Sequence, residues 1–300
     1  MFLYFCDYKS LPDLKALIMI INQQDSWFQN ITTVFRQRKK KKKLGIVLSG
    51  GGARGLAHVG VLKALEEYGI SPDIVAGSSM GAIIGGLYAS GKSFDDMMDL
   101  IGQVRSYKII RMGLPLGGIT DLTYLKNMLK EHIPNDTFES LQKPLYVCAS
   151  NLNSGRYEFF NSGKLSAAII ASAAIPLIFK PVKINDQSYI DGGVLNNLPV
   201  EAIRDICDVV IGVNVNPNAS ASNSSVSSMW GIGERVFDMH MAENVKSRLG
   251  QCDVVIEVPN ALDYGLFDFK MGNLLVDFGY NDALGKVPEI LEKAKISTSV

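Results

Sequence analysis

A serine flanked by glycines offers a nucleophile at residues 77–81, Gly-Ser-Ser-Met-Gly. The pattern is G-x-S-x-G with Ser79 at its centre, and it stands between an apolar run and a helical pattern. In a sharp strand-to-helix turn, the residues two before and two after the serine approach each other closely, which gives Gly77 and Gly81 a steric reason. A serine on such a turn is exposed for attack, so the pattern indicates acyl transfer.

A second glycine turn, at residues 50–55, has the sequence Gly-Gly-Gly-Ala-Arg-Gly and follows the apolar run 44–48. Bare backbone amides at the start of a helix can stabilise a developing oxyanion. Donors of this kind beside an exposed hydroxyl are what acyl transfer requires. The two turns together favour a serine acyl hydrolase.

The base that would activate Ser79 is harder to find, and a serine hydroxyl is a poor nucleophile until a base takes its proton. A packed or surface role is favoured for His58, His132 lies at an expected helix C-terminus, and His240 lies within a helical pattern. Asp191 is the better candidate because it follows an apolar strand and precedes two glycines. An Asp-Gly hairpin turn explains the same residues equally well.

Two other patterns suggest nucleotide binding and are weaker. Residues 50–55 match G-x-G-x-x-G, but a dinucleotide site also needs an acidic residue at the end of the second strand, and Asp73 stands at its beginning. Residues 86–93 match the phosphate loop G-x-x-x-x-G-K-[ST], yet they continue a helix instead of following a strand. There Gly91 is better read as a helix terminator and Ser93 as the N-cap of the next helix.

The pattern around the two glycine turns predicts a strand, a crossover helix and a second strand, which together form a βαβ unit. We therefore predict an α/β fold, a three-layer α/β/α sandwich with a mostly parallel central sheet covered on both faces. Strands are predicted at 44–49, 73–76, 144–151, 156–160, 178–184, 188–190, 208–215 and 253–258. Helices are predicted at 55–68, 79–90, 94–104, 121–132, 165–174, 199–205, 229–249 and 270–295. Two stretches are predicted as loops, an apolar one at 106–119 that is either a lid or a packed connection, and a mobile one at 216–228.

Composition narrows the function further. Formal net charge is zero, but residues 36–43 hold seven of the 30 basic residues, which leaves 23 basic against 30 acidic residues elsewhere. The chain outside residues 36–43 therefore lacks the excess of basic residues that is typical of nucleic-acid-binding proteins. Three scattered histidines and four cysteines without a C-x-x-C pair make a metal site improbable and favour buried free thiols in a reducing compartment, hence a cytoplasmic location. The cysteines are Cys6, Cys148, Cys207 and Cys252.

Residues 1–43 differ from the rest of the chain. The apolar run 14–21 has only eight residues and contains Lys15, so it cannot span a bilayer. Aromatic and aliphatic residues at helical spacing follow it, and then the basic run, a combination that suggests peripheral contact of residues 14–43 with anionic lipid. The alternatives are a solvated tail or an extension made from an upstream start codon. We divide the chain into this N-terminal extension, 1–43, and an acyl hydrolase domain, 44–300.

These motifs, in this order, resemble the patatin-like phospholipase family in its bacterial form. The likeness rests on the glycine turn at 50–55, the serine turn at 77–81 and Asp191-Gly192-Gly193, with Ser-Ala-Ala-Ile-Pro at 172–176 adding to it. It extends from about Leu44 to Val215 and more loosely to the end of the chain.

The resemblance implies a Ser–Asp dyad without a catalytic histidine, with Ser79 as nucleophile and Asp191 as general base. It also implies an oxyanion hole made by Gly50, Gly51 and Gly52. The loop-supporting residues would be Arg54 and Gly55, and the motif glycines Gly77, Gly81, Gly192 and Gly193. The implied reaction is hydrolysis of acyl esters in phospholipids or related lipids, of phospholipase A, lysophospholipase or carboxylester lipase type, with neither metal nor cofactor. The alternative is a non-catalytic lipid-binding or regulatory module that keeps the fold.

Overall fold

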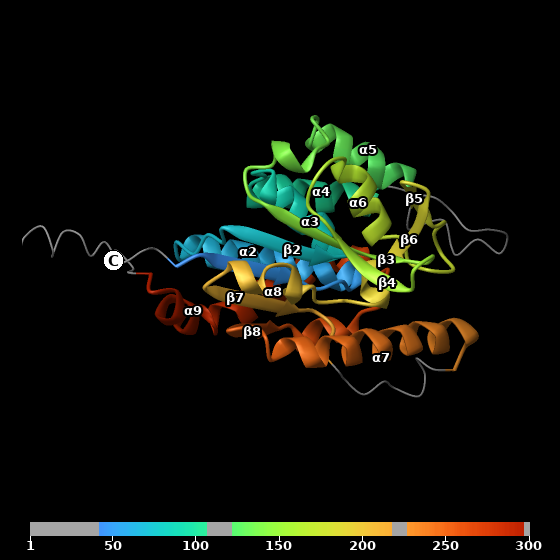
Figure 1. Cartoon of the computed structure of the whole chain (residues 1–300). Coiled ribbons are helices and arrows are strands. Elements are labelled where there is room, and N and C mark those ends of the chain that lie inside the picture. Colours follow the sequence, from blue (N-terminus) through green and yellow to red (C-terminus); the bar gives the residue numbers. More distant parts are fainter. Residues whose placement is uncertain (1–41, 107–121, 218–226, 297–300) are drawn as a thin grey trace, which may run out of the picture. The chain divides into compact units, whose positions relative to one another are not determined.

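An eight-stranded sheet forms the centre of the protein. The computed structural model describes residues 42–106, 122–217 and 227–296. Strands follow the order β5-β6-β3-β2-β1-β7-β8 across the sheet, and β4 pairs with β3 off this path (Figure 1). The predicted strands are all present, with bounds of Leu44–Leu48 (β1), Ile74–Ser78 (β2), Leu145–Asn151 (β3), Arg156–Phe160 (β4), Val182–Ile184 (β5), Gln187–Asp191 (β6), Val209–Asn214 (β7) and Val254–Glu257 (β8).

The sheet is parallel through its middle and antiparallel at one side. The strands β3, β2, β1, β7 and β8 are parallel neighbours, whereas β4 and β6 run antiparallel to β3, and β5 antiparallel to β6. The central strands β1, β2 and β7 are buried along their whole length, as expected for strands with both faces covered. The predicted α/β class with a mostly parallel sheet is confirmed.

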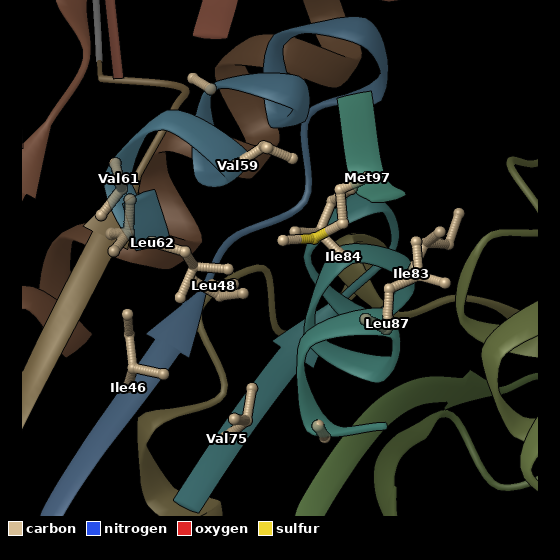
Figure 2. Close-up of a cluster of buried hydrophobic side chains, with 14 of the residues drawn as sticks. Ile46, Leu48, Val59, Val61, Leu62, Val75, Ile83, Ile84, Leu87 and Met97 are labelled. Carbon is tan, nitrogen blue, oxygen red and sulfur yellow. The ribbon is translucent and has the colours of Figure 1, made fainter. Parts of the chain in front are cut away.

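Helices cover both faces of this sheet. Their bounds are Ala57–Glu67 (α2), Met80–Ala89 (α3), Phe94–Ser106 (α4), Thr123–His132 (α5), Leu165–Ser172 (α6), Met229–Leu249 (α7), Gly272–Leu284 (α8) and Val287–Ala294 (α9). One face packs Ile46 and Leu48 of β1 against Leu62 of α2 and Ile84 of α3 in the large core cluster, with Val75 of β2 beside them (Figure 2). Because successive side chains of a strand point to opposite faces, Val47 faces the other side, where Val245 of α7 belongs to the second cluster.

Register explains how two distant motifs meet. Ser78 at the end of β2 is paired with Cys148 of β3, and Ala149, the next residue of β3, is paired with Asp191 at the end of β6. The residue after Ser78 therefore lies across one strand from Asp191. In this antiparallel register the C-terminal end of β6 lies beside the middle of β3.

Some local predictions need correction. The segment 199–205 is not an α-helix but two short 3₁₀ turns, Val200–Ala202 and Arg204–Ile206. The final helical region is two helices, because α8 ends at Leu284 and α9 starts at Val287. Ser93 caps α4 as predicted, since its hydroxyl accepts the amide of Asp96 at 3.2 Å and the Asp96 carboxylate accepts the Ser93 amide at 2.9 Å.

Several predictions fall on parts of the chain that lie outside the described residues. These are the extension up to residue 41, nearly all of the apolar loop at 106–119 and most of the low-complexity loop at 216–228. The division of the chain at residue 43 and the contact of residues 14–43 with lipid stay predictions. Within the described ranges, no helix is both long enough and apolar enough to cross a bilayer.

Candidate active site

Ser79 occupies a strained turn between β2 and α3. Its backbone has φ 50° and ψ −121°, a conformation that a residue with a side chain adopts only when its surroundings enforce it. A methyl group on Gly77 would overlap the carbonyl of Gly81, and one on Gly81 would overlap the carbonyl of Leu48. The two glycines therefore permit the close approach that presents the serine, as the sequence predicted.

The amide of Ser79 donates to the hydroxyl of Ser172, the last residue of α6, at 2.8 Å. This hydrogen bond connects the serine turn to α6, the helix that was predicted at 165–174 from its run of small residues. Ser172 itself is fully buried. Its role as a backbone support could not be predicted, because nothing in the sequence says that this hydroxyl faces the serine turn.

Asp191 and Ser79 are brought together as the resemblance implies. The Ser79 hydroxyl donates to Asp191 Oδ2 at 2.6 Å, while Asp191 Oδ1 accepts the amide of Gly193 at 2.8 Å. The carboxyl group is buried, with 1% of the residue exposed. Burial raises the pKa of Asp191 to about 7, and the hydrogen bonds from Ser79 and Gly193 limit that rise.

The glycine turn lies beside this pair. The backbone amides of its first three residues differ in whether they already have a hydrogen-bond partner. The Gly50 amide is already used, since it donates to the backbone carbonyl of Asn197 at 3.2 Å and to its side-chain oxygen at 3.0 Å. The amides of Gly51 and Gly52 have no hydrogen-bond partner among the described residues. Gly52 has φ 54°, and the Leu266 carbonyl occupies the place of a Cβ there, so only glycine fits.

Asparagine and arginine side chains fix the orientation of the turn. Asn216 donates to the Gly50 carbonyl at 2.7 Å, and that carbonyl shares a peptide group with the Gly51 amide. In a trans peptide the C=O and N–H bonds point in opposite directions, so this contact aims the Gly51 amide away from Asn216. Arg54 in turn donates to Asn216 Oδ1 at 3.0 Å and to the Tyr264 carbonyl at 2.7 Å.

A cavity of about 190 Å³, with Ser79 among its lining residues, is almost entirely apolar. It follows one face of α3, where Met80, Ile83, Ile84 and Leu87 line it at helical spacing. Gly52 of the glycine turn also lines it. Ser79 and Gly52, whose amide is free, therefore line the same apolar compartment.

No histidine takes part in this arrangement. His58 is fully buried, its Nε2 lies 2.8 Å from the Ser49 carbonyl, and burial lowers its pKa to about 4, so it supports the backbone just before the glycine turn. His240 contacts the Val194 carbonyl at 2.5 Å. His132 stands at the C-terminal end of α5. Sequence reasoning gave none of the three a catalytic role, and neither does their placement.

Metal ligands do not gather anywhere in the described ranges: no group of three or more His, Cys, Asp or Glu side chains is placed to hold an ion. Cys148 and Cys207 are buried free thiols, as predicted, and Cys252 is half-buried.

Sequence reasoning missed four polar residues that hold the site: Asn197, Asn216, Asp238 and Asn244. Asparagines in loops, such as Asn197 and Asn216, are interpreted as turn formers, and polar residues within a helical pattern, such as Asp238 and Asn244, are interpreted as solvated. Their roles become visible only in the folded structure, because each contacts a motif residue that is far away in the sequence.

Comparison with known proteins adds to this geometry. Residues 46–204 match the sequence model of the patatin-like phospholipase family. A protein of Emericella nidulans named Lysophospholipase nte1 is 32% identical over 293 residues, covering 86% of this chain and 19% of that protein. An uncharacterized NTE family protein of Mycobacterium tuberculosis is 32% identical over 196 residues, covering 63% of this chain and 54% of that protein.

The chain thus spans about a fifth of the length of the fungal relative and about half of the mycobacterial one. Among solved structures, VipD from Legionella pneumophila is similar at a TM-score of 0.45 and 15% identity, covering 83% of this chain and 67% of that one. Since the family's sequence model matches just over half of the 300 residues, and the matched span contains both glycine-flanked turns and Asp191, the chain belongs to the patatin-like phospholipase family.

Proposed function

We propose that this protein hydrolyses acyl ester bonds of lipids, with Ser79 as nucleophile and Asp191 as general base. The observation that carries the proposal is the hydrogen bond of 2.6 Å from the Ser79 hydroxyl to a buried carboxylate, where Ser79 also lines an apolar cavity. Family membership and the relative named as a lysophospholipase support it.

In the first half of the reaction, the Asp191 carboxylate takes the Ser79 proton while the serine oxygen bonds to the ester carbonyl carbon. The carbonyl electrons move onto its oxygen and form a tetrahedral oxyanion. When this intermediate collapses, the bond to the alcohol breaks and Asp191 returns the proton to the departing oxygen. The acyl group stays on Ser79 as an ester.

In the second half, Asp191 takes a proton from water as the water oxygen attacks the acyl carbon. Collapse releases the fatty acid, and the serine oxygen regains its proton from Asp191. An ordinary aspartate, with a pKa near 3.8, is a weak base for either step. A pKa of about 7 brings the base close to the working pH, where general-base catalysis is most efficient.

The amides of Gly51 and Gly52 are free to donate hydrogen bonds to the oxyanion, whereas the amide of Gly50 already donates to Asn197. This narrows the three-glycine oxyanion hole expected from the resemblance to two donors. Arg54 and Gly55 support the loop without a direct part in the chemistry, and Gly192 and Gly193 fix the turn after Asp191. Preorganised donors of this kind contribute a factor of about 10² to 10³ each.

The substrate follows from the lining of the cavity. A compartment lined by aliphatic and aromatic side chains excludes charged groups and favours an acyl chain, since transfer of each methylene from water contributes about 0.8 kcal/mol. The polar part of the lipid then remains outside, towards solvent. We therefore propose a phospholipid, a lysophospholipid or a related acyl ester as the substrate.

Product analysis tests the proposal. The purified protein is incubated with mixed phospholipids and lysophospholipids in detergent micelles, and fatty acids are measured by mass spectrometry. Wild type is expected to release fatty acid, Ser79→Ala to release none, and Ser90→Ala, at the opposite end of α3, to match wild type. A fluorophosphonate probe is expected to label wild type and not Ser79→Ala. A wild-type protein that neither releases fatty acid nor reacts with the probe would instead be the non-catalytic member of the fold.

A further inference from the structure

A continuous chain of hydrogen bonds joins Asp191 to the glycine turn through two asparagines. Asp191 accepts the Gly193 amide at 2.8 Å, and the Gly193 carbonyl accepts the side-chain amide of Asn244 at 2.9 Å. The Asn244 side-chain oxygen accepts the backbone amide of Asn197 at 2.9 Å. Asn197 Oδ1 then accepts the Gly50 amide at 3.0 Å.

Packing around Asn197 shows that this chain is built into the site. Asn197 is fully buried, and its Oδ1 would lie 2.5 Å from a Cβ on Gly50 and 2.7 Å from a Cβ on Gly193. The side-chain amide of Asn197 therefore fills the space that two motif glycines leave empty. One side chain contacts both the turn that carries the free amides and the turn that holds the base.

Asn244 connects this pair to a long helix. It lies on α7, beyond the residues 46–204 that match the family, and uses its oxygen as acceptor and its nitrogen as donor at the same time. An amide side chain carries an acceptor oxygen and a donor nitrogen on separate atoms, so it can bond two backbone groups at once. The helix makes other polar contacts with the same region, since Asp238 bonds Arg54 and Glu234 accepts the Leu266 amide at 2.8 Å.

We infer that Asn197 and Asn244 are positioning residues, which hold the free amides of the glycine turn at a fixed place relative to Ser79 and Asp191. The inference rests on the proposed function. Neither asparagine lines the apolar cavity, so neither contacts the acyl chain. Their effect is on the geometry of the step in which the oxyanion forms, where small displacements of a donor cost much of its contribution.

The experiment compares Asn244→Ala with Glu243→Ala, an exposed neighbour on the same turn of α7. A short water-soluble ester serves as substrate. The expected result for Asn244→Ala is a kcat lower by about tenfold to a hundredfold, with KM within about twofold of wild type. Glu243→Ala is expected to match wild type in both constants.

Asn244→Asp tests the donor half of the link. It keeps the acceptor for the Asn197 amide but places a carboxylate oxygen against the Gly193 carbonyl, so its kcat is expected to fall at least as far as that of Asn244→Ala. The double variant Asn197→Ala/Asn244→Ala is expected to lose little more kcat than the larger of its two single variants, because both substitutions break one chain of contacts.

A readout that needs no hydrolysis keeps this inference separate from the proposed function. Hydrogen exchange of the backbone amides in residues 50–54 is expected to be faster in Asn244→Ala than in wild type and Glu243→Ala. The inference is overturned if Asn244→Ala keeps both the wild-type kcat and the wild-type exchange rates. It is also overturned if the loss of kcat in Asn244→Ala equals the fraction of that variant that is unfolded, since the loss then reflects stability alone. If wild type hydrolyses no ester, the proposed function fails, while the exchange comparison still decides whether the link fixes the turn.

Discussion

Both carboxylate oxygens of Asp238 bond the guanidinium of Arg54, at 2.8 Å and 3.0 Å. The side chains are 4% and 14% exposed, respectively for Arg54 and Asp238, so the pair is shielded from solvent. Asp238→Ala leaves the arginine charge buried without its carboxylate. We expect a loss of about 3 kcal/mol in the free energy of unfolding, together with lower turnover, measured by urea denaturation and by ester hydrolysis.

An exposed ion pair provides the control for that substitution. Glu289 and Lys293 pair at 3.0 Å, with side chains 39% and 42% exposed. Glu289→Ala is expected to change the free energy of unfolding by less than about 1 kcal/mol, without effect on turnover. Equal effects of the two substitutions would contradict a special role of the Arg54 pair in holding the glycine turn.

Activity is expected to rise with pH through about 7. The proposed base works as a carboxylate, and the pKa of Asp191 is raised to about 7 by burial. Below that pH the group is increasingly protonated and cannot accept the serine proton. The measurement is kcat/KM for a short ester from pH 5 to 9. A profile that is flat across this range, or whose acidic limb lies near pH 4, would mean that another group limits the reaction.

Stability is expected to change with pH in the opposite direction. Because the folded-state pKa of Asp191 lies above its ordinary value near 3.8, the folded protein binds more protons than the unfolded chain between about pH 4 and 7. The contribution of this group is then greatest at low pH and is lost as the pH rises through 7. Asp191→Asn is expected to be inactive but more stable than wild type at pH 8, by about 1 to 3 kcal/mol. Equal melting temperatures at pH 8 would count against this.

Gly81→Ala is expected to disrupt the serine turn. Its methyl group would overlap the carbonyl of Leu48, and β1, which carries Leu48, is held between β2 and β7. We expect a loss of about 1 to 3 kcal/mol in the free energy of unfolding and loss of fluorophosphonate labelling. Gly233→Ala is the control, because a Cβ there meets nothing within 4 Å on α7, and it is expected to stabilise by about 0.5 to 1 kcal/mol.

Ile83→Phe is expected to shorten the acyl chains that the protein accepts. Ile83 lines the apolar cavity one turn of α3 beyond Ser79, so a larger side chain reduces the space next to Ser79. We expect the kcat/KM ratio of a long-chain to a short-chain ester to fall by about tenfold, since one or two methylenes are worth about 1 to 3 kcal/mol. The volume-conserving Ile83→Leu is expected to keep the wild-type ratio. Identical chain-length profiles for all three proteins would show that the acyl chain binds elsewhere.

The strands and the serine turn could be predicted because each is a local pattern. Apolar runs that end in glycines gave β1 and β2, and the spacing of Gly77, Ser79 and Gly81 gave the turn. Asp191 was a weaker prediction, since its neighbours also suit a hairpin. The register that brings it to Ser79 involves a third strand, β3, and no local pattern in the sequence encodes that pairing.

The supporting residues could not be predicted for a related reason. Asn197 and Asn244 are 47 positions apart, and Asn197 contacts Gly50 across 147 positions. Single asparagines are common both in loops, where Asn197 lies, and on helices, where Asn244 lies, and the partners of both side chains are backbone groups, which leave no mark in the sequence. The free amides of Gly51 and Gly52 likewise became distinguishable from that of Gly50 only through these contacts.

The position of β7 decides which pieces of this chain can be produced on their own. That strand lies between β1 and β8, although it begins at Val209, after the family match ends at residue 204. A fragment limited to the matched span would expose the whole hydrogen-bonding edge of β1, the strand that leads into the glycine turn. Open edges of that kind promote aggregation. Recombinant fragments for crystallisation or screening therefore have to include β7 and β8.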